Sequence, residues 1–211
     1  MSTRGSSREI VADNIVHVLG ILSGVVAATL LLGWALLTQP LSATAAVAIY
    51  CAGLVAMLGC SAAYHMLPAP AWRGTLRRLD HAAIFLKIAG TYTPFALVKM
   101  EGLAGVSLFA GVWSVALLGA AGKLLLGASW DRLAIAVYLA LGWSGVVAYE
   151  PLVSSVAPAA LVLLAAGGIV YSVGVIFFLW RSLPYQTAIW HVFVLLGTAC
   201  HFGAVSIALA H

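Results

Sequence analysis

Charged residues are scarce in this sequence. Only 8% of its 211 residues are Asp, Glu, Lys or Arg, whereas 64% are hydrophobic, and the mean hydropathy is +1.10. A soluble domain of this size does not need so much apolar surface, so the composition excludes that class and indicates a polytopic membrane protein.

Cysteine is also scarce. Cys51, Cys60 and Cys200 are odd in number, lie in apolar stretches and lack the spacing of cysteine metal sites. We interpret them as small packing residues. No fixed-period repeat or low-complexity segment stands out in the sequence.

Long apolar runs make up most of what remains. A helix needs about 20 apolar residues to cross the hydrocarbon core of a bilayer. Seven such runs predict an all-α, polytopic seven-helix bundle over residues 14–211, after a polar cytoplasmic segment at residues 1–13. They use nearly the whole chain, so the function must lie within the bundle or at its ends. The predicted crossings are Ile15–Leu37, Ala43–Leu67, His81–Val98, Leu103–Leu126, Leu133–Tyr149, Val156–Trp180 and Ala188–Ala210.

The basic residues predict the orientation of this bundle. One side of the predicted crossings carries Lys99 beside Glu101, and the other carries Arg4, Arg8, Arg73, Arg77, Arg78, Lys123, Arg132 and Arg181. The positive-inside rule therefore places the N-terminus in the cytoplasm and the C-terminus outside. The net charge of +4 then reflects loops that face anionic lipid and gives no indication of nucleic-acid binding. The first run is longer than a signal-peptide core, so we expect a permanent helix.

Three ionisable residues that lie far apart in the sequence fall at the cytoplasmic ends of predicted helices. His65 ends the second helix, Asp80 opens the third and His191 begins the seventh. Charge within a membrane is costly, so groups at one depth predict a shared polar site. Two imidazoles and a carboxylate suit zinc, which gives His65, His191 and Asp80 as metal ligands with water in a fourth position. Such a water has a pKa of about 7 and supplies hydroxide for attack on an amide or ester carbonyl.

Asp80 and Ser61 are the candidate catalytic residues. Asp80 is suited to ligating the metal or to orienting its water, and equally to capping the third helix. Ser61 lies four residues before His65, so its hydroxyl can bond His65 or a nearby water, or its own helix. His81 points about 100° away from Asp80 around the helix.

Three further polar residues give weaker indications of a role in the site. His17, early in the first helix, is a spare ligand, a residue that supports the ligands or an ordinary helix-start histidine. His201 lies about 15 Å beyond His191 along one helix, too deep for the same ion. Lys87 is predicted to face the bundle interior, with Tyr92 and Thr93 as its expected partners.

Several separated motifs resemble the bacterial haemolysin III family, which is related to the progestin and adipoQ receptors, adiponectin receptors included. They are Asn14-Ile-Val-His17, Ser61-Ala-Ala-Tyr-His65, Leu79-Asp80-His81, Ala89-Gly-Thr-Tyr-Thr-Pro-Phe95, Trp190-His191-Val-Phe-Val-Leu and His201-Phe202. The resemblance implies a seven-helix bundle in the bacterial inner (plasma) membrane. It also implies a zinc ion held by one histidine of the second helix and two of the seventh, with Asp80 near the zinc-bound water.

One position departs from that family pattern. The family usually has a histidine four residues before the Trp-His histidine, and Thr187 stands there in this chain. A threonine hydroxyl is a poor zinc ligand, so we expect Asp80 or a water to fill the gap, or the site to be empty. The resemblance implies a ceramidase-like zinc hydrolase acting on a membrane lipid. The alternatives are a receptor-like or structural lipid-binding bundle with a degraded metal site, and a cytolytic pore-forming protein.

Overall fold

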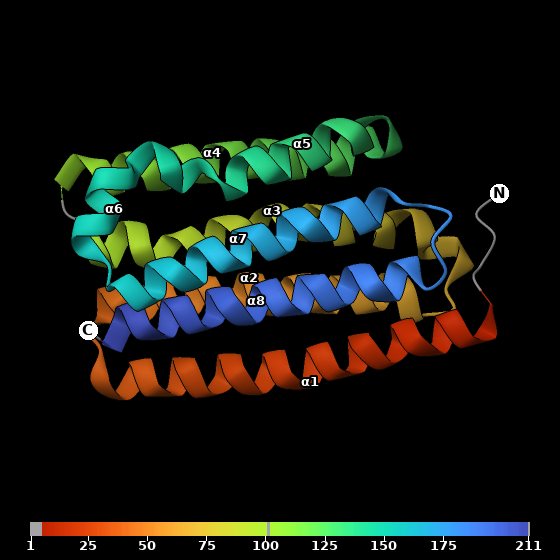
Figure 1. The fold of residues 1–211 in the computed structure, drawn as a ribbon, viewed down its shortest axis with the longest axis horizontal. Helices are drawn as coiled ribbons and strands as arrows, with labels where there is room; N and C mark the ends of the chain where they lie inside the picture. The colour runs from red at the N-terminus through yellow and green to blue at the C-terminus, as the bar shows by residue number, and fades with distance from the viewer. Residues whose placement is uncertain (1–5, 101, 211) are drawn as a thin grey trace.

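The computed structural model describes residues 6–100 and 102–210, and within these ranges all regular secondary structure is helical. This confirms the predicted all-α class. Figure 1 shows the helices packed lengthwise in one bundle. The α-helices are α1 (Ser7–Thr38), α2 (Leu41–Met66), α3 (Arg73–Pro94), α4 (Gly102–Leu126), α5 (Asp131–Gly142), α6 (Tyr149–Ser155), α7 (Pro158–Leu179) and α8 (Gln186–Ala210). Four short helical turns connect them: η1 (Pro70–Trp72), η2 (Phe95–Lys99), η3 (Gly127–Trp130) and η4 (Ser144–Ala148).

Six helical stretches of the described chain are long and apolar enough to cross a membrane. One of them, Gly102–Ser155, has 54 residues and contains α4, α5 and α6. The chain turns within it at Gly127, whose φ of +60° lies in the left-handed region that glycine adopts readily. Figure 1 accordingly shows α4 and α5 side by side. By length and hydropathy this stretch is one candidate membrane crossing, so the seven crossings and the orientation of the termini stay predictions.

The first helix begins well before the apolar run that predicted it. Ser6 caps α1: its Oγ accepts a hydrogen bond from the backbone N–H of Glu9 (3.4 Å), and its own N–H donates to Glu9 Oε2 (2.6 Å). This capping box satisfies donors that the first turn leaves free. Residues 7–13, predicted as part of a polar segment, are therefore helical. Asp13 and His17, four residues apart, lie on one face of α1.

The third helix also begins earlier than predicted. It starts at Arg73 instead of His81, after the turn η1, which has Pro70 at its first position. Asp80 thus lies two turns inside α3 and does not cap it, contrary to one of the roles considered for it. Hydropathy detects the apolar part of a helix, whereas the polar turn that carries Arg77 and Arg78 extends α3 beyond that part.

A tyrosine holds the break that follows α5. The Tyr92 hydroxyl of α3 donates to the carbonyl of Gly142 (2.7 Å) and accepts from the N–H of Gly145 (2.9 Å). Both backbone groups lie where the helical ladder is interrupted, and such groups need partners inside a membrane. Tyr92 therefore stabilises the break at the end of α5 and is not a partner of Lys87.

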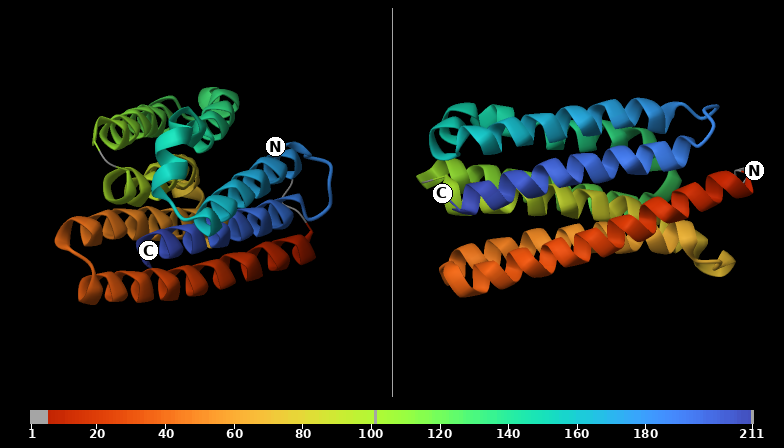
Figure 2. Two further views of the ribbon diagram at one scale, coloured as in Figure 1. Left: turned by 60° about the vertical axis from the view of Figure 1, so that its left-hand side comes forward. Right: turned by 60° about the horizontal axis from the view of Figure 1, so that its bottom comes forward.

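Two apolar clusters form the core. One is built mainly from α1, α2 and α8, and the other from α3, α4 and α5. Many of the contacting residues are small, as is typical of helix interfaces in membranes. Figure 2 shows α1 and α5 on opposite sides of the bundle, with α3 and α8 between them.

One end of the bundle collects most of the charge. The start of α1, the α2–α3 turn, the α4–α5 turn and the α7–α8 loop all lie at this end in Figure 1. The described basic residues near these connections are Arg8, Arg73, Arg77, Arg78, Lys123, Arg132 and Arg181. Their clustering at one end is the pattern on which the predicted cytoplasmic face depends.

Candidate metal centre

Four residues with metal-ligating side chains meet at the basic end of the bundle. They are Asp13 and His17 of α1, His65 of α2 and His191 of α8. One potential ligand atom from each lies within 4.8 Å of those of the others. Three of the four are buried, and His65 is partly buried. Helices that are distant in sequence thus supply a compact set of donors.

The local structure explains why these side chains meet. Asp13 and His17 project from one face of α1, since they are separated by about one helical turn. His65 lies in the last turn of α2, and His191 lies near the start of α8. Because these helix ends lie at the same end of the bundle, the three imidazoles come together. Their ring centroids are 4.2 to 4.9 Å apart.

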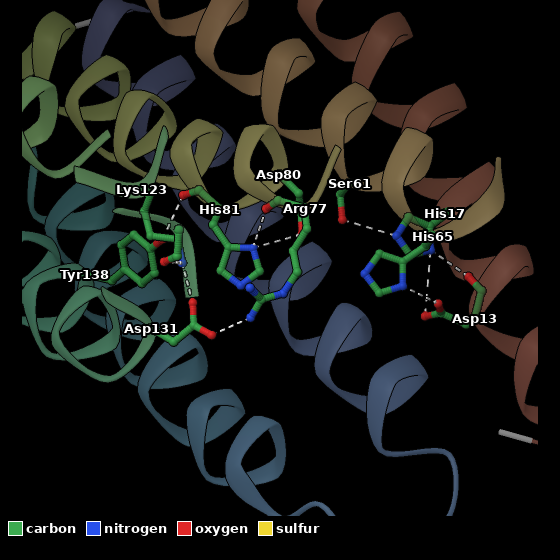
Figure 3. A network of polar contacts seen from close by, with 11 residues as sticks. Asp13, His17, Ser61, His65, Arg77, Asp80, His81, Lys123, Asp131 and Tyr138 are labelled. Carbon is green, nitrogen blue, oxygen red and sulfur yellow. Dashed lines mark hydrogen bonds and ion pairs between the residues drawn. The ribbon is translucent and has the colours of Figure 1, made fainter. Parts of the chain in front are cut away.

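Asp13 contacts all three imidazoles. His191 Nδ1 donates a hydrogen bond to Asp13 Oδ1 (2.7 Å), and His65 Nδ1 lies 3.1 Å from Asp13 Oδ2. His17 Nδ1 donates to the backbone carbonyl of Asp13 (2.9 Å). The other nitrogen of His17, Nε2, contacts the Ser61 hydroxyl at 3.2 Å. Figure 3 shows the contacts of His17 and His65 with Asp13 and Ser61.

The donor set fits a transition-metal ion. Imidazole nitrogens and a carboxylate oxygen are ordinary zinc ligands, and ligand atoms about 2.0–2.1 Å from a tetrahedral zinc lie about 3.4 Å apart. The four donors of this chain lie within 4.8 Å of one another. The donors would have to approach one another by up to about 1.4 Å to reach tetrahedral spacing. The group can therefore hold a metal ion, although the geometry alone does not select zinc over its neighbours.

The structure brings together some of the residues predicted from the sequence and separates others. His65 and His191 lie together, with ring centroids 4.6 Å apart. Asp80 is not part of the four-residue group: its Oδ2 lies 3.6 Å from His81 Nδ1, the adjacent residue on α3. Ser61 contacts His17 and not His65. The proposed ligand role of Asp80 and the catalytic roles of Asp80 and Ser61 stay predictions.

Asp13 is the member of the candidate site that the sequence interpretation missed. It lies before the first apolar run, in the segment predicted to be polar and separate. Two local signals were present: the Ser6–Glu9 capping spacing that starts α1, and the four-residue spacing to His17. Thr187 takes no part in the group, and its hydroxyl donates to Gln186 Oε1 (3.4 Å).

A second polar network lies beside the candidate metal centre and joins three helices. Asp131, the first residue of α5, binds both Arg77 of α3 and Lys123 of α4. Lys123 also donates to the carbonyl of Gly127 (3.3 Å), and Tyr138 of α5 donates to the carbonyl of His81 (2.7 Å). Figure 3 shows this network. Its groups are paired with one another, which indicates a structural role in holding α3, α4 and α5 together.

Lys87 occupies a third polar position, deeper in the bundle. Its Nζ lies 3.3 Å from His201 Nδ1 and 4.5 Å from the centre of the Tyr171 ring. The expected partners are engaged elsewhere: Tyr92 holds the break after α5, and Thr93 accepts a hydrogen bond from Trp113 Nε1 (3.0 Å). His201 is a hydrogen-bonding histidine of the interior and lies outside the metal group.

Comparison with known proteins supplies the family. The model of the family described as "Haemolysin-III related" matches residues 8–202. The chain belongs to the haemolysin III family. Hemolysin-3 of Bacillus cereus is 37% identical over 94% of this chain and 90% of its own length. The Hemolysin-3 homolog of Bacillus subtilis (strain 168) is 36% identical over 94% and 93%. This confirms the resemblance drawn from the motifs.

A more distant similarity extends outside bacteria. The Monocyte to macrophage differentiation factor of Homo sapiens is 27% identical over 74% of this chain and 67% of its own length. No solved structure gives a significant match. Together with the six apolar helices, the haemolysin III relatives establish an integral membrane protein.

Proposed function

We propose that this haemolysin III protein is a zinc-dependent hydrolase of lipid amide bonds, with a ceramidase-like reaction at the cytoplasmic face of the plasma (inner) membrane. The observation that carries the proposal is the group of three imidazoles and one carboxylate at one end of an apolar bundle. Ionisable groups at membrane depth are costly and typically serve function. An imidazole-rich set of this kind favours zinc.

The chemistry and the depth of the site suggest the substrate. When bound, zinc supplies hydroxide near neutral pH and polarises a carbonyl oxygen. His65 lies in the last turn of α2, His191 lies near the start of α8, and Asp13 and His17 lie in the first three turns or so of α1, on the side of the basic residues. We therefore infer a site near the boundary between headgroups and acyl chains. The bond that joins the polar part of a lipid to its acyl chain lies at this depth. A membrane lipid is accordingly the proposed partner.

The protein residues have distinct proposed tasks. Asp13 holds the imidazoles through their Nδ1 atoms. Among the described residues the one ion-pair contact of Asp80 is His81, at 3.6 Å, so its carboxylate is available to orient water and to take up a proton. Ser61 contacts His17 and is positioned to hold a water beside the imidazoles. We propose Asp80 and Ser61 as catalytic residues that act on water, not as ligands.

The test is turnover of a fluorescent ceramide by purified, zinc-loaded protein in mixed micelles, with an ester lipid measured in parallel. His65→Ala should lower turnover by more than 100-fold, because it removes a ligand. Asp80→Asn should lower turnover while zinc per polypeptide stays the same. Glu150→Gln, a change on an exposed residue, is the control and should act like wild type.

Two other functions correspond to different results of the same experiment. Saturable lipid binding by folded protein without any turnover would favour a receptor-like or structural bundle and contradict hydrolysis. Leakage of lipid vesicles that survives His65→Ala would favour a cytolytic pore. Among the described residues, the ionisable groups concentrate at one end and Lys87 lies deeper, so the pore has less support.

A further inference from the structure

The three imidazoles of the metal centre turn the same ring atom toward Asp13. The Nδ1 of His191 lies 2.7 Å from a carboxylate oxygen, that of His65 lies 3.1 Å from the other, and that of His17 lies 2.9 Å from the backbone carbonyl. All three oxygens can only accept hydrogen bonds. The Nδ1 atoms of His17 and His191 must therefore carry the hydrogen in their hydrogen bonds, and a hydrogen on His65 Nδ1 would make its 3.1 Å contact attractive as well. A neutral imidazole protonated at Nδ1 has its free lone pair at Nε2.

The contact of His17 with Ser61 agrees with this tautomer. His17 Nε2 lies 3.2 Å from Ser61 Oγ, and a serine hydroxyl can donate to an unprotonated ring nitrogen. Nδ1 of this ring thus donates to Asp13, and the Nε2 lone pair accepts from Ser61, a hydroxyl that a metal ion bound at Nε2 would displace. In Figure 3 the His17 and His65 rings each have a contact to Asp13, and the His17 contact to Ser61 comes from its other nitrogen.

We propose that Asp13 is a positioning residue, and that the Nε2 atoms of His17, His65 and His191 hold the metal. The inference rests on the proposed metal-dependent function and assigns separate roles to the residues of its site. A carboxylate that accepts Nδ1–H fixes the tautomer and the orientation of a metal-binding histidine and raises its basicity. Here the Asp13 carboxylate contacts Nδ1 of His191 and of His65, and the backbone carbonyl of Asp13 accepts from Nδ1 of His17. Three histidines leave the fourth position of a tetrahedral zinc open, as catalysis requires.

This arrangement explains how the site tolerates Thr187. The expected second histidine of α8 is missing, and Thr187 lies outside the group. His17 approaches from α1 instead, with its ring centroid 4.2 Å from that of His191. A three-histidine set is thereby restored with a different third helix. Asp13 belongs to the site because it lies about one turn before His17 on the same face of α1.

The alternative is that Asp13 ligates the metal directly, beside the Nδ1 atoms. The distances favour hydrogen bonds. Ligand atoms on a tetrahedral zinc lie about 3.4 Å apart, whereas the contact between His191 Nδ1 and Asp13 Oδ1 is 2.7 Å, a normal hydrogen-bond length. Either nitrogen of His17 must give up a hydrogen bond to bind a metal: Nδ1 would lose its 2.9 Å bond to the Asp13 carbonyl and its hydrogen, whereas Nε2 would lose only the longer 3.2 Å contact with the Ser61 hydroxyl.

X-ray absorption spectroscopy of the zinc-loaded, full-length protein in detergent tests this assignment. The outer-shell scattering of bound imidazoles should fit three histidines in wild type. His17→Ala should reduce the fit to two and weaken zinc affinity by more than 100-fold. Asp13→Asn keeps one oxygen acceptor and the side-chain shape, so three imidazoles should remain while affinity falls by about 10–100-fold. Glu150→Gln should change neither quantity.

Two results would overturn the ligand assignment. A wild-type spectrum with a carboxylate oxygen and two imidazoles would overturn the assignment without reference to any variant, as would complete loss of zinc in a folded Asp13→Asn protein. Ceramide turnover measured on the same samples separates the two proposals. Three bound imidazoles without turnover would refute the hydrolase and keep the ligand assignment, whereas turnover with Asp13 bound to zinc would do the reverse.

Discussion

Replacing Asp131 with asparagine should destabilise the bundle by about 2–3 kcal/mol. Asp131 is the carboxylate that pairs with both Arg77 and Lys123, and it thereby links α5 to α3 and α4. The Lys123 side chain is only 1% exposed. Asparagine preserves the shape and one oxygen acceptor, but it leaves the buried ammonium without a counter-charge.

The magnitude follows from the burial of the two partners. Breaking a buried ion pair by removing one member costs about 3–5 kcal/mol, because the remaining charge is uncompensated. Asp131 is itself 31% exposed, so water screens part of the interaction and the lower value applies. Lys123→Met removes the buried charge and leaves Asp131 paired with Arg77, so this change alone should cost less than about 1 kcal/mol.

The assay is reversible unfolding in mixed micelles, in which the free energy is measured for wild type, both single variants and the double variant. If the buried charge causes the loss, the double variant should resemble Lys123→Met, with a coupling free energy of about 2 kcal/mol. Glu150→Gln controls for the loss of a carboxylate from an exposed site. Additive single effects, or a change below about 0.5 kcal/mol for Asp131→Asn, would refute the reasoning.

Three further predictions concern packing, the helix break and the metal. Gly105→Ala should lower the free energy of unfolding by several kcal/mol, because the new Cβ would lie 2.2 Å from a backbone oxygen of η2. Gly59→Ala places its Cβ in open space, so thermal unfolding should show it to be neutral or stabilising by up to about 1 kcal/mol. Tyr92→Phe should cost about 1–3 kcal/mol through two lost backbone contacts, with Tyr149→Phe, on an exposed residue, as the silent control in the same assay. Zinc at about 100 times its dissociation constant should raise the free energy of unfolding by about 2.7 kcal/mol, and a chelator should reverse this increase. A similar increase in the His191→Ala protein would contradict the role of His191 in the metal site.

The sequence carried most of the information on class and family. A charged fraction of 8% and long apolar runs required a membrane bundle, and the separated motifs indicated the family that the comparisons confirm. The positions of Arg and Lys predicted that His65 and His191 share one end of the bundle. The two rings do meet, 4.6 Å apart, because helix direction alternates from one crossing to the next.

The composition of the candidate site depended on the tertiary structure. Asp13 stands outside the apolar run that predicted the first helix, and Asp80 stands at the expected depth but contacts His81 instead. Depth along a helix can be estimated by counting residues from an interface. Whether a side chain at that depth faces the site depends on the rotation of each helix and on which helices are neighbours.

Hydropathy and charge are properties of single residues summed along the chain, so the sequence by itself determined the membrane class, the family and the end of the bundle at which polar residues gather. The packing of α1 beside both α2 and α8 results from side-chain contacts among all three helices, and no local pattern contains it. Only that packing decided that Asp13 and His17 join His65 and His191, and that Asp80 and Thr187 do not.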